Sequence, residues 1–200
     1  MTQIFGNFVQ ESPEKEYLIL FFSPHSFHYQ FWKRSKLSAD FIADYFEPFL
    51  VHQEEEMRKK VSSIKIKNLQ HAVKYISNEL LENAMKFQEV ASPLTIHFQL
   101  SWSCEKMIFY VTNSINTRKV DFFQTFIKQL TNENAEELYM KKLMSNAKDN
   151  TSSGLGLLSM IYLYSVQLGW KFETLQTAQN IMKVSTRVCL DTLKIEKESW

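Results

Sequence analysis

Residues 77–87, Ser-Asn-Glu-Leu-Leu-Glu-Asn-Ala-Met-Lys-Phe, place Glu79 and Asn83 one helical turn apart within an amphipathic pattern. At about 100° per residue, the apolar positions around them fall within an arc of roughly 80°. Asn83 lies about 60° from Leu80 on this wheel and Glu79 about 100° from it, so Asn83 borders the buried stripe and Glu79 stands on its shoulder. A carboxamide there is costly to bury unless it is hydrogen-bonded. The stretch therefore predicts a helix over residues 67–89 with a polar site at its edge.

A second informative segment, residues 151–158, is a small-polar and glycine loop that leads into an apolar helix predicted over residues 155–168. Gly154 and Gly156 are two of only four glycines in the chain. Without a Cβ, they let the backbone take unusual φ values and approach a ligand closely. The free amides and the positive dipole end of the following helix favour an anion. The segment therefore indicates a phosphate-binding loop.

Each segment also has a simpler interpretation. Asn83 can be a structural side chain bonded to backbone, with Glu79 an ordinary surface residue. Ser152 or Ser153 can cap the second helix while the glycines only turn the chain. The order and residue types of the two segments together favour a nucleotide site.

Composition limits the class of protein. The chain has 200 residues, 44% hydrophobic and 22% charged, which is typical of a soluble globular domain. Its formal net charge of +1 gives no electrostatic reason to bind nucleic acid or an anionic membrane. The apolar runs are too short to span a bilayer, and the N-terminus has no signal-like stretch. Cys104 and Cys189 fit small core residues in a reducing compartment, so we expect a cytoplasmic protein.

The rest of the chain alternates between strands and helices. Strands are predicted over residues 4–10, 17–22, 94–102, 106–112, 170–175 and 181–190, and further helices over 27–50 and 119–131. The charged run 54–60 is interpreted as a solvated connection. Residues 132–153 are interpreted as a polar lid in which 135–143 can form a short helix.

These elements predict an α+β fold, a two-layer sandwich with a mixed, mostly antiparallel sheet and helices packed on one face. Residues 1–64 form an N-terminal strand–helix elaboration that is integrated with a core of residues 65–200. We therefore expect a single domain overall.

This order of elements resembles the Bergerat-fold (GHKL, histidine-kinase-like) ATPases. Residues 78–87 look like the N box of that family, and residues 153–158 look like its G2 box. Within the family the chain looks most like the serine/threonine kinases that act on STAS-type anti-sigma antagonists, especially the SiaB-like kinases. The resemblance covers about residues 65–190. It implies ATP and Mg²⁺ as cofactors and a small STAS-like protein as substrate in a bacterial partner switch.

The resemblance also assigns roles to individual residues. Glu79 would accept the proton of the attacking hydroxyl, and Asn83 would hold Mg²⁺ through its carboxamide oxygen. Lys148, and less directly Lys141 and Lys142, would approach the terminal phosphate from the lid, although a solvated lid face explains each lysine as well. The implied cofactor-binding residues are Asn83, Asn113, Lys148, Ser153, Gly154, Leu155, Gly156 and Thr186.

The chain departs from the family pattern at three places. The adenine box normally has an Asp followed by glycines, whereas here Asn113 is followed by Ser-Ile-Asn. An Asn side chain can pair with adenine through its carbonyl and amine, but the missing glycines leave less room. The final glycine-rich segment is also absent, with Thr186 the only candidate for its threonine. No phosphoacceptor histidine motif precedes residue 77, which argues against a histidine kinase.

Two functions follow from these matches to the family pattern and departures from it. The first is an ATP-dependent serine/threonine kinase that phosphorylates a STAS-like partner. The second is a catalytically degenerate module that regulates its partner by binding without phosphorylation. The helix predicted over residues 27–50 carries eight aromatic side chains. Because aromatics are enriched at interface cores, the sequence also allows a homodimer.

Overall fold

The computed structural model describes residues 2–11, 16–23, 31–56, 63–103, 105–149, 154–175 and 180–197. In chain order the elements are β1 (Thr2–Gly6), β2 (Glu16–Phe22), α1 (Phe31–Glu56), α2 (Ser63–Phe87), β3 (Ile96–Trp102), β4 (Lys106–Asn116), α3 (Thr117–Asn132), α4 (Ala135–Asp149), α5 (Gly156–Tyr164), β5 (Gln167–Thr174), β6 (Ile181–Asp191) and the short 3₁₀ helix η2 (Lys194–Lys197).

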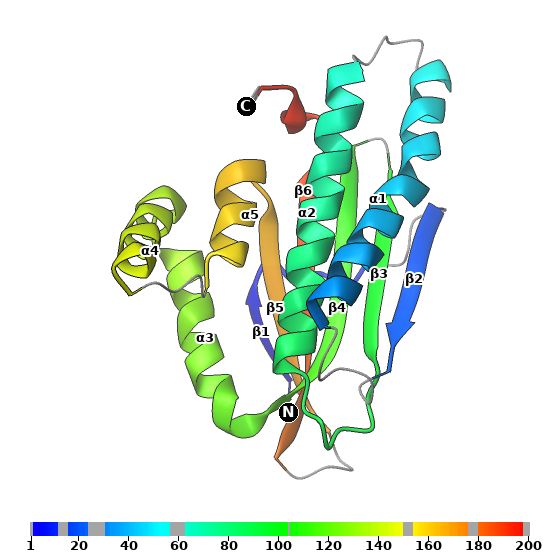
Figure 1. Ribbon diagram of the computed structural model, residues 1–200. Helices are drawn as coiled ribbons and strands as arrows, with labels where there is room; N and C mark the ends of the chain where they lie inside the picture. The colour runs from blue at the N-terminus through cyan, green and yellow to red at the C-terminus, as the bar shows by residue number, and fades with distance from the viewer. Residues whose placement is uncertain are drawn as a thin grey trace.

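Six strands form one sheet in the order β1-β5-β6-β4-β3-β2, and every pairing in it is antiparallel. The helices lie on one face of this sheet (Figure 1). The predicted α+β two-layer sandwich is therefore confirmed, with a sheet that is antiparallel throughout the described strands. The N-terminal strands β1 and β2 form its two edges, so they share one sheet with the strands that follow residue 95.

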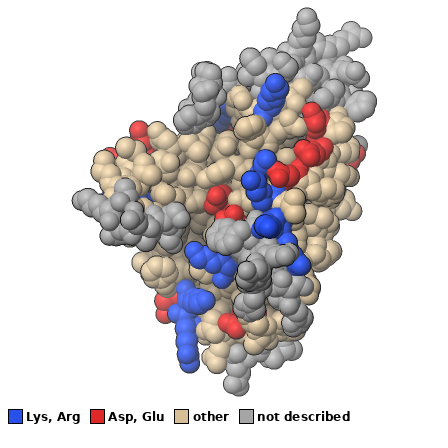
Figure 2. Space-filling model, viewed as in Figure 1, with Lys and Arg blue, Asp and Glu red and all other residues tan. Residues whose placement is uncertain are grey.

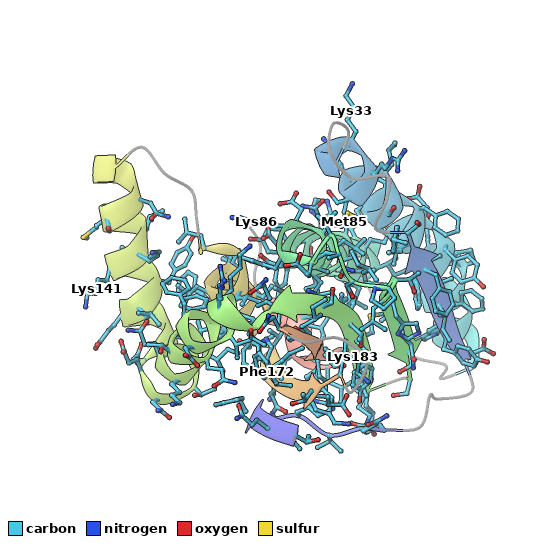
Figure 3. All side chains as sticks on the ribbon, turned by 90° about the horizontal axis from the view of Figure 1, so that it is seen from below. Lys33, Met85, Lys86, Lys141, Phe172 and Lys183 are labelled. Carbon is cyan, nitrogen blue, oxygen red and sulfur yellow. The ribbon has the colours of Figure 1, made fainter. Side chains whose placement is uncertain are left out.

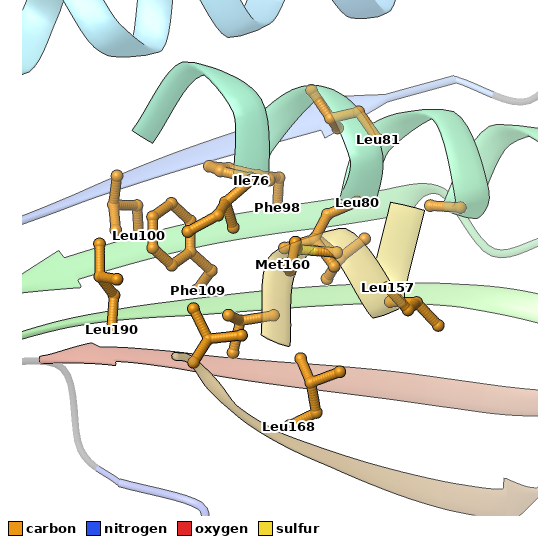
Figure 4. Close-up of a cluster of buried hydrophobic side chains, with 14 of the residues drawn as sticks. Ile76, Leu80, Leu81, Phe98, Leu100, Phe109, Leu157, Met160, Leu168 and Leu190 are labelled. Carbon is orange, nitrogen blue, oxygen red and sulfur yellow. The ribbon is translucent and has the colours of Figure 1, made fainter. Parts of the chain in front are cut away.

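The core lies between the sheet and the two helices α2 and α5. Ile76 and Leu80 of α2 and Met160 of α5 point toward the strands, where Phe98 and Phe109 meet them (Figure 4). Alternate residues of a strand face the same side, so the inward positions of β3, β4 and β6 are apolar except at Asn113 and Thr186. This packing holds α2 and α5 in contact with each other.

Helix α1 packs along α2, on the side of the sheet that β3 and β2 form (Figure 1). Its Phe46 ring lies 4.0 Å, centroid to centroid, from the Trp102 ring of β3. The helix continues to Glu56, so the prediction of a non-helical connection from residue 54 was wrong at its start. Glutamate is a good helix former, and nothing in residues 54–56 stops the helix. Residues 57–60 of that run lie outside the described residues.

The predicted helix over residues 155–168 ends earlier, at Tyr164. Ser165 takes a left-handed conformation, with φ 52° and ψ 34°, and its N–H donates to the Ile161 carbonyl at 2.9 Å. Residues 167–174 then join the sheet as β5. An apolar run does not distinguish a buried helix from a buried strand, and pairing with β1 and β6 decides between them here.

The N-terminal strap, residues 7–11, crosses the face of the sheet opposite the helices. The Asn7 N–H donates to the Leu168 carbonyl at 2.8 Å, and the Tyr110 hydroxyl donates to the Val9 carbonyl at 2.5 Å. The strap backbone passes so close to β5 that a Cβ on Gly169 would overlap it. The predicted strand over residues 4–10 was thus wrong beyond Gly6, because the chain leaves the sheet edge and turns across it.

Candidate functional site

The structure brings Glu79 of α2 against Gly156, the first residue of α5. A Cβ on Gly156 would overlap the Glu79 carboxylate, whose Cδ atom lies 2.8 Å from that position. The two predicted segments, separated by more than seventy residues, therefore meet where any side chain at position 156 would displace the Glu79 carboxylate. The absence of a side chain at Gly156 makes room for the carboxylate at the helix start.

Glu79 is partly buried and forms no ion pair within the described residues. Burial, and to a lesser extent the negative charge of Glu82, raises its pKa from an ordinary value of 4.5 to about 7. Desolvation penalises the charged form of a carboxylate when no cation compensates it. A carboxylate with a pKa near 7 can take up and release a proton at neutral pH.

Tyr75 lies one helical turn before Glu79 and ties α2 to α5. Its hydroxyl interacts with Ser159, and its ring centroid lies 5.6 Å from that of Tyr164. Burial, together with the nearby Glu79 charge, raises the pKa of Tyr75 to about 12 despite the opposing effect of the Ser159 hydrogen bond. Tyr75 thus stays protonated, and its contacts orient the helix face that carries Glu79.

Asn83 lies one turn after Glu79 and is also partly buried. Its side chain makes no hydrogen bond to the part of the chain that the structure describes. The neighbouring polar pair behaves differently, since the Asn78 amide donates to the Glu82 carboxylate at 2.9 Å. Within the described residues, Asn83 therefore lacks the backbone bond that the structural interpretation requires.

The glycine loop is shaped by backbone conformation. Gly154 has a φ of +83°, a value that L side chains rarely adopt. Leu155 occupies the N-cap of α5 and provides no side-chain cap, whereas Ser152 and Ser153, the predicted caps, lie outside the described residues. The Leu155 carbonyl accepts the Ser159 N–H at 2.7 Å. Among the described residues, no side chain caps the first amides of α5, an arrangement that suits an anion.

A lysine from α4 reaches this loop. The Lys142 Cε and Nζ atoms lie 3.3 and 3.9 Å from the position of a Cβ on Gly154. Lys141, its neighbour, points away from α5 (Figure 3). The sequence favoured Lys148 for this role, but its side chain lies outside the described residues, as does Ser153. Helix α4 also spans residues 135–149, longer than the short helix expected over 135–143.

Asn113 and Thr186 lie in the sheet beneath the helices. Strand β4 continues to Asn116, beyond the expected end at residue 112, because β6 pairs with it over its whole length. Asn113 is only 7% exposed, and its amide donates to the Ser114 carbonyl at 3.0 Å. Thr186 pairs with Val111, so it shares the helix-facing side with Asn113.

Aromatic side chains fill the sheet surface next to Asn113 and Thr186. Phe123 of α3 stacks on Phe87 at 6.3 Å and contacts Phe172 edge-on at 5.9 Å. Trp170, which is fully buried, pairs across the sheet with Thr186. The sequence analysis did not assign these residues to the site. Their alternation in β5 identified a strand, but only the tertiary contacts place them beside Asn113.

The charged groups of the site are visible from the helix side. Figure 2 shows acidic side chains near the middle of this face, where α2 and α5 meet in Figure 1, with basic side chains below them. No group of three or more His, Cys, Asp or Glu side chains that could hold a metal ion occurs among the described residues. An ion at this site would need further ligands from water or from a bound nucleotide.

Comparison with known proteins identifies the fold. The chain superposes on a chain in the crystal structure of the SiaB–SiaC complex from Pseudomonas aeruginosa with a TM-score of 0.56. The match covers 86% of this chain and 89% of that one, at 11% sequence identity. No protein-family model and no curated protein matches the chain. Within the described residues, no helix has both the length and the hydropathy needed to cross a membrane.

Proposed function

We propose that this protein is an ATP-dependent serine/threonine kinase of the Bergerat type that phosphorylates a small STAS-like partner. The observation that carries the proposal is the contact between the Glu79 carboxylate and Gly156. A proton acceptor with a pKa near 7 thus lies at the start of α5, where no described side chain caps the helix, and Lys142 lies beside Gly154 of the preceding loop. These are the parts that phosphoryl transfer needs: a base, an anion site and a cation.

In this proposal the terminal phosphate of ATP lies at the start of α5, between Glu79 and Lys142. The hydroxyl oxygen of a Ser or Thr on the partner attacks the terminal phosphorus, and the bond from phosphorus to the bridging oxygen breaks, so that ADP leaves. Glu79 accepts the hydroxyl proton, and Lys142 and the α5 amides offset charge on the phosphate. Tyr75 and Ser159 keep α2 and α5 in register so that the carboxylate faces the phosphate.

The residues present also fit Mg²⁺. Asn83 offers a carboxamide oxygen with no hydrogen bond in the described chain, one helical turn from Glu79. Mg²⁺ is commonly bound through one or two protein oxygens together with water and substrate phosphates, which agrees with the absence of a cluster of acidic ligands in the described residues. When bound, the ion would neutralise phosphate charge.

A second function is supported by the sheet side of the site. The Asn113 amide is bonded to its neighbour's carbonyl, and Trp170 and Phe172 fill the adjoining surface. An adenine ring would have to compete with these contacts. They favour a catalytically degenerate module that regulates its partner by binding alone.

The fold comparison supports a partner protein in either case. The similar chain belongs to a complex of two proteins, SiaB and SiaC. We therefore propose a small STAS-like protein as the binding partner and a role in partner switching in the cytoplasm. Because the identity is 11%, this assignment rests on shared architecture together with the site residues.

Calorimetric titration with ATP and Mg²⁺ tests the site directly. We expect wild type to bind, and Asn83→Ala and Gly156→Val each to weaken binding about tenfold or more, since each removes a well-placed contact or blocks the loop. Asn78→Ala, which removes a carboxamide of the same helix that is directed to Glu82, is the matched control and should bind as wild type does. Absence of binding heat and of any shift in Tm at millimolar nucleotide would reject the nucleotide site.

A labelling assay separates the two functions. The protein is incubated with radiolabelled ATP and a candidate STAS-like partner, and mass spectrometry locates any phosphorylated Ser or Thr. Labelling supports the kinase. Binding of ATP and partner without labelling supports the regulatory module.

A further inference from the structure

Between Lys33 and Glu47 the outward surface of α1 carries an apolar stripe, with basic residues on its N-terminal side and acidic residues on its C-terminal side. Leu37, Phe41 and Tyr45 recur every four residues and are 68%, 52% and 40% exposed. The Phe41 and Tyr45 rings lie 6.0 Å apart. Side chains four apart share one face of a helix, so the three form a continuous stripe along the solvent side of α1. We call it the α1 stripe.

Charge is divided along the same helix. The basic residues Lys33, Arg34 and Lys36 precede the stripe, whereas the acidic residues Asp40, Asp44 and Glu47 accompany or follow it. Figure 3 shows Lys33 at the N-terminal end of α1, extended away from the body of the protein. Lys33 and Asp44 are exposed, and neither forms an ion pair within the described residues. Asp40 differs, because it pairs with Lys74 of α2 at 2.5 Å.

This distribution is self-complementary. In an isologous dimer the same patch meets itself in reverse, so two α1 helices that cross antiparallel place the basic end of one against the acidic end of the other. If Leu37 packs on Phe41 of the second copy, Lys33 lies next to Asp44 of that copy. Lys33 and Asp44 lie about 80° and 60° from Phe41 on the same flank of the stripe, and a two-fold axis brings matching flanks together.

We propose that this protein forms a homodimer through the α1 stripe, with Leu37 and Phe41 at its centre and a Lys33–Asp44 pair repeated on each side. A second copy satisfies both features of the surface at once, since it buries the apolar stripe and pairs both charges. The proposal does not depend on nucleotide binding or on kinase activity, because α1 is separated from α5 by α2 (Figure 1).

Sedimentation equilibrium over a wide range of protein concentration tests the proposal. Wild type should approach twice the chain mass of 23.7 kDa. Phe41→Glu and Leu37→Glu should each raise the dimer Kd at least about tenfold, because each puts a charge at the centre of the apolar stripe. Phe122→Glu is the matched control. Phe122 of α3 is 83% exposed and lies outside the stripe, so this substitution should leave the Kd unchanged.

Charge reversal identifies the arrangement of the two copies. Lys33→Glu and Asp44→Lys should each raise the Kd by about three- to tenfold, more at low salt, and the double variant should restore it. Circular dichroism checks that each variant is folded. A wild type that is monomeric at every concentration overturns the proposal. So does a Phe122→Glu variant whose dimer Kd rises as much as that of Phe41→Glu. Failure of the double variant to recover, or a monomer whose α1 stripe binds a different protein, also overturns it.

Discussion

Glu79 and Glu11 are both partly buried carboxylates, yet their surroundings shift their pKa values in opposite directions. Burial raises the pKa of Glu79 to about 7, and no cation in the described residues opposes it. Burial acts on Glu11 too, but hydrogen bonds and charges from Lys106 and Arg187, at 2.6 and 2.5 Å, outweigh it and lower its pKa. The difference separates a carboxylate without a compensating cation from one that is ion-paired on two sides.

The two sites also differ in position. Glu79 lies on the helix side of the sheet, at the junction of α2 and α5. Glu11 belongs to the N-terminal strap on the opposite face, where its carboxylate covers the nearly buried Arg187. Perturbed and uncompensated groups mark functional sites more often than compensated ones do. Substitution of each carboxylate tests whether this distinction is functional.

Glu79→Gln should reduce phosphoryl transfer to the partner by about 10²-fold or more while leaving ATP binding intact, because it keeps the shape and removes the proton acceptor. Glu11→Gln should leave transfer unchanged. The measurement is single-turnover labelling of the partner at saturating ATP. Equal rates for wild type and Glu79→Gln would keep a kinase but exclude Glu79 as its base.

Glu11→Gln should lower the free energy of unfolding by about 2 kcal/mol at pH 7, since it leaves Arg187, 4% exposed, without its carboxylate. This figure is reduced from that of a fully buried pair because the Glu11 side chain is 26% exposed. The folded pKa of Glu11 is lowered from 4.5. Its contribution is therefore present above pH 4.5 and is lost as pH falls through the folded pKa.

Urea unfolding of wild type and Glu11→Gln across pH 3–8 measures this effect. The two curves should converge at the acid end of the range. If the difference in unfolding free energy between wild type and Glu11→Gln stays constant down to the lowest pH, the ion pair of Glu11 with Arg187 is not its cause.

Glu79→Gln should instead stabilise the protein, by about 1–2 kcal/mol at pH 8. The pKa of Glu79 in wild type is higher in the folded state than its ordinary value of 4.5. The stability that the protonated Glu79 contributes is therefore fully present below pH 4.5 and is lost as pH rises through about 7. Wild type and variant should therefore have similar stability near pH 4.5 and diverge above it. Thermal unfolding as a function of pH provides the measurement, and a destabilised variant at pH 8 would contradict the carboxylate's uncompensated state.

The smallest expected effect concerns hydrogen exchange. Amides of residues 135–149 should exchange a few-fold more slowly when Mg²⁺ and ATP bind, because Lys142 would be held by phosphate. Amides of the strap, residues 7–11, should not respond. Mass spectrometry of peptic peptides from both segments gives the comparison within one sample, and equal slowing in both would indicate a global effect.

Much of the architecture could be predicted from sequence because it depends on local periodicity. The pattern around Leu80 predicted α2 and its polar edge, and alternation predicted the strands near residues 96–102 and 181–190. Predictions failed where local pattern was ambiguous. The run after Tyr164 reads equally as helix or strand, and only pairing with β1 and β6 makes it β5.

Local pattern was sufficient to identify the residue types of the candidate site: a carboxylate, a carboxamide one turn later, and two glycines at a helix start. The contacts of Glu79 with Gly156, of Lys142 with Gly154, and of aromatic rings with the surroundings of Asn113 exist only in the folded chain. The same is true of the ion pairs of Glu11, which Glu79 lacks within the described residues. Desolvation and ion pairing depend on contacts between residues far apart in the chain, such as 79 with 156 and 11 with 187, and no local pattern records them.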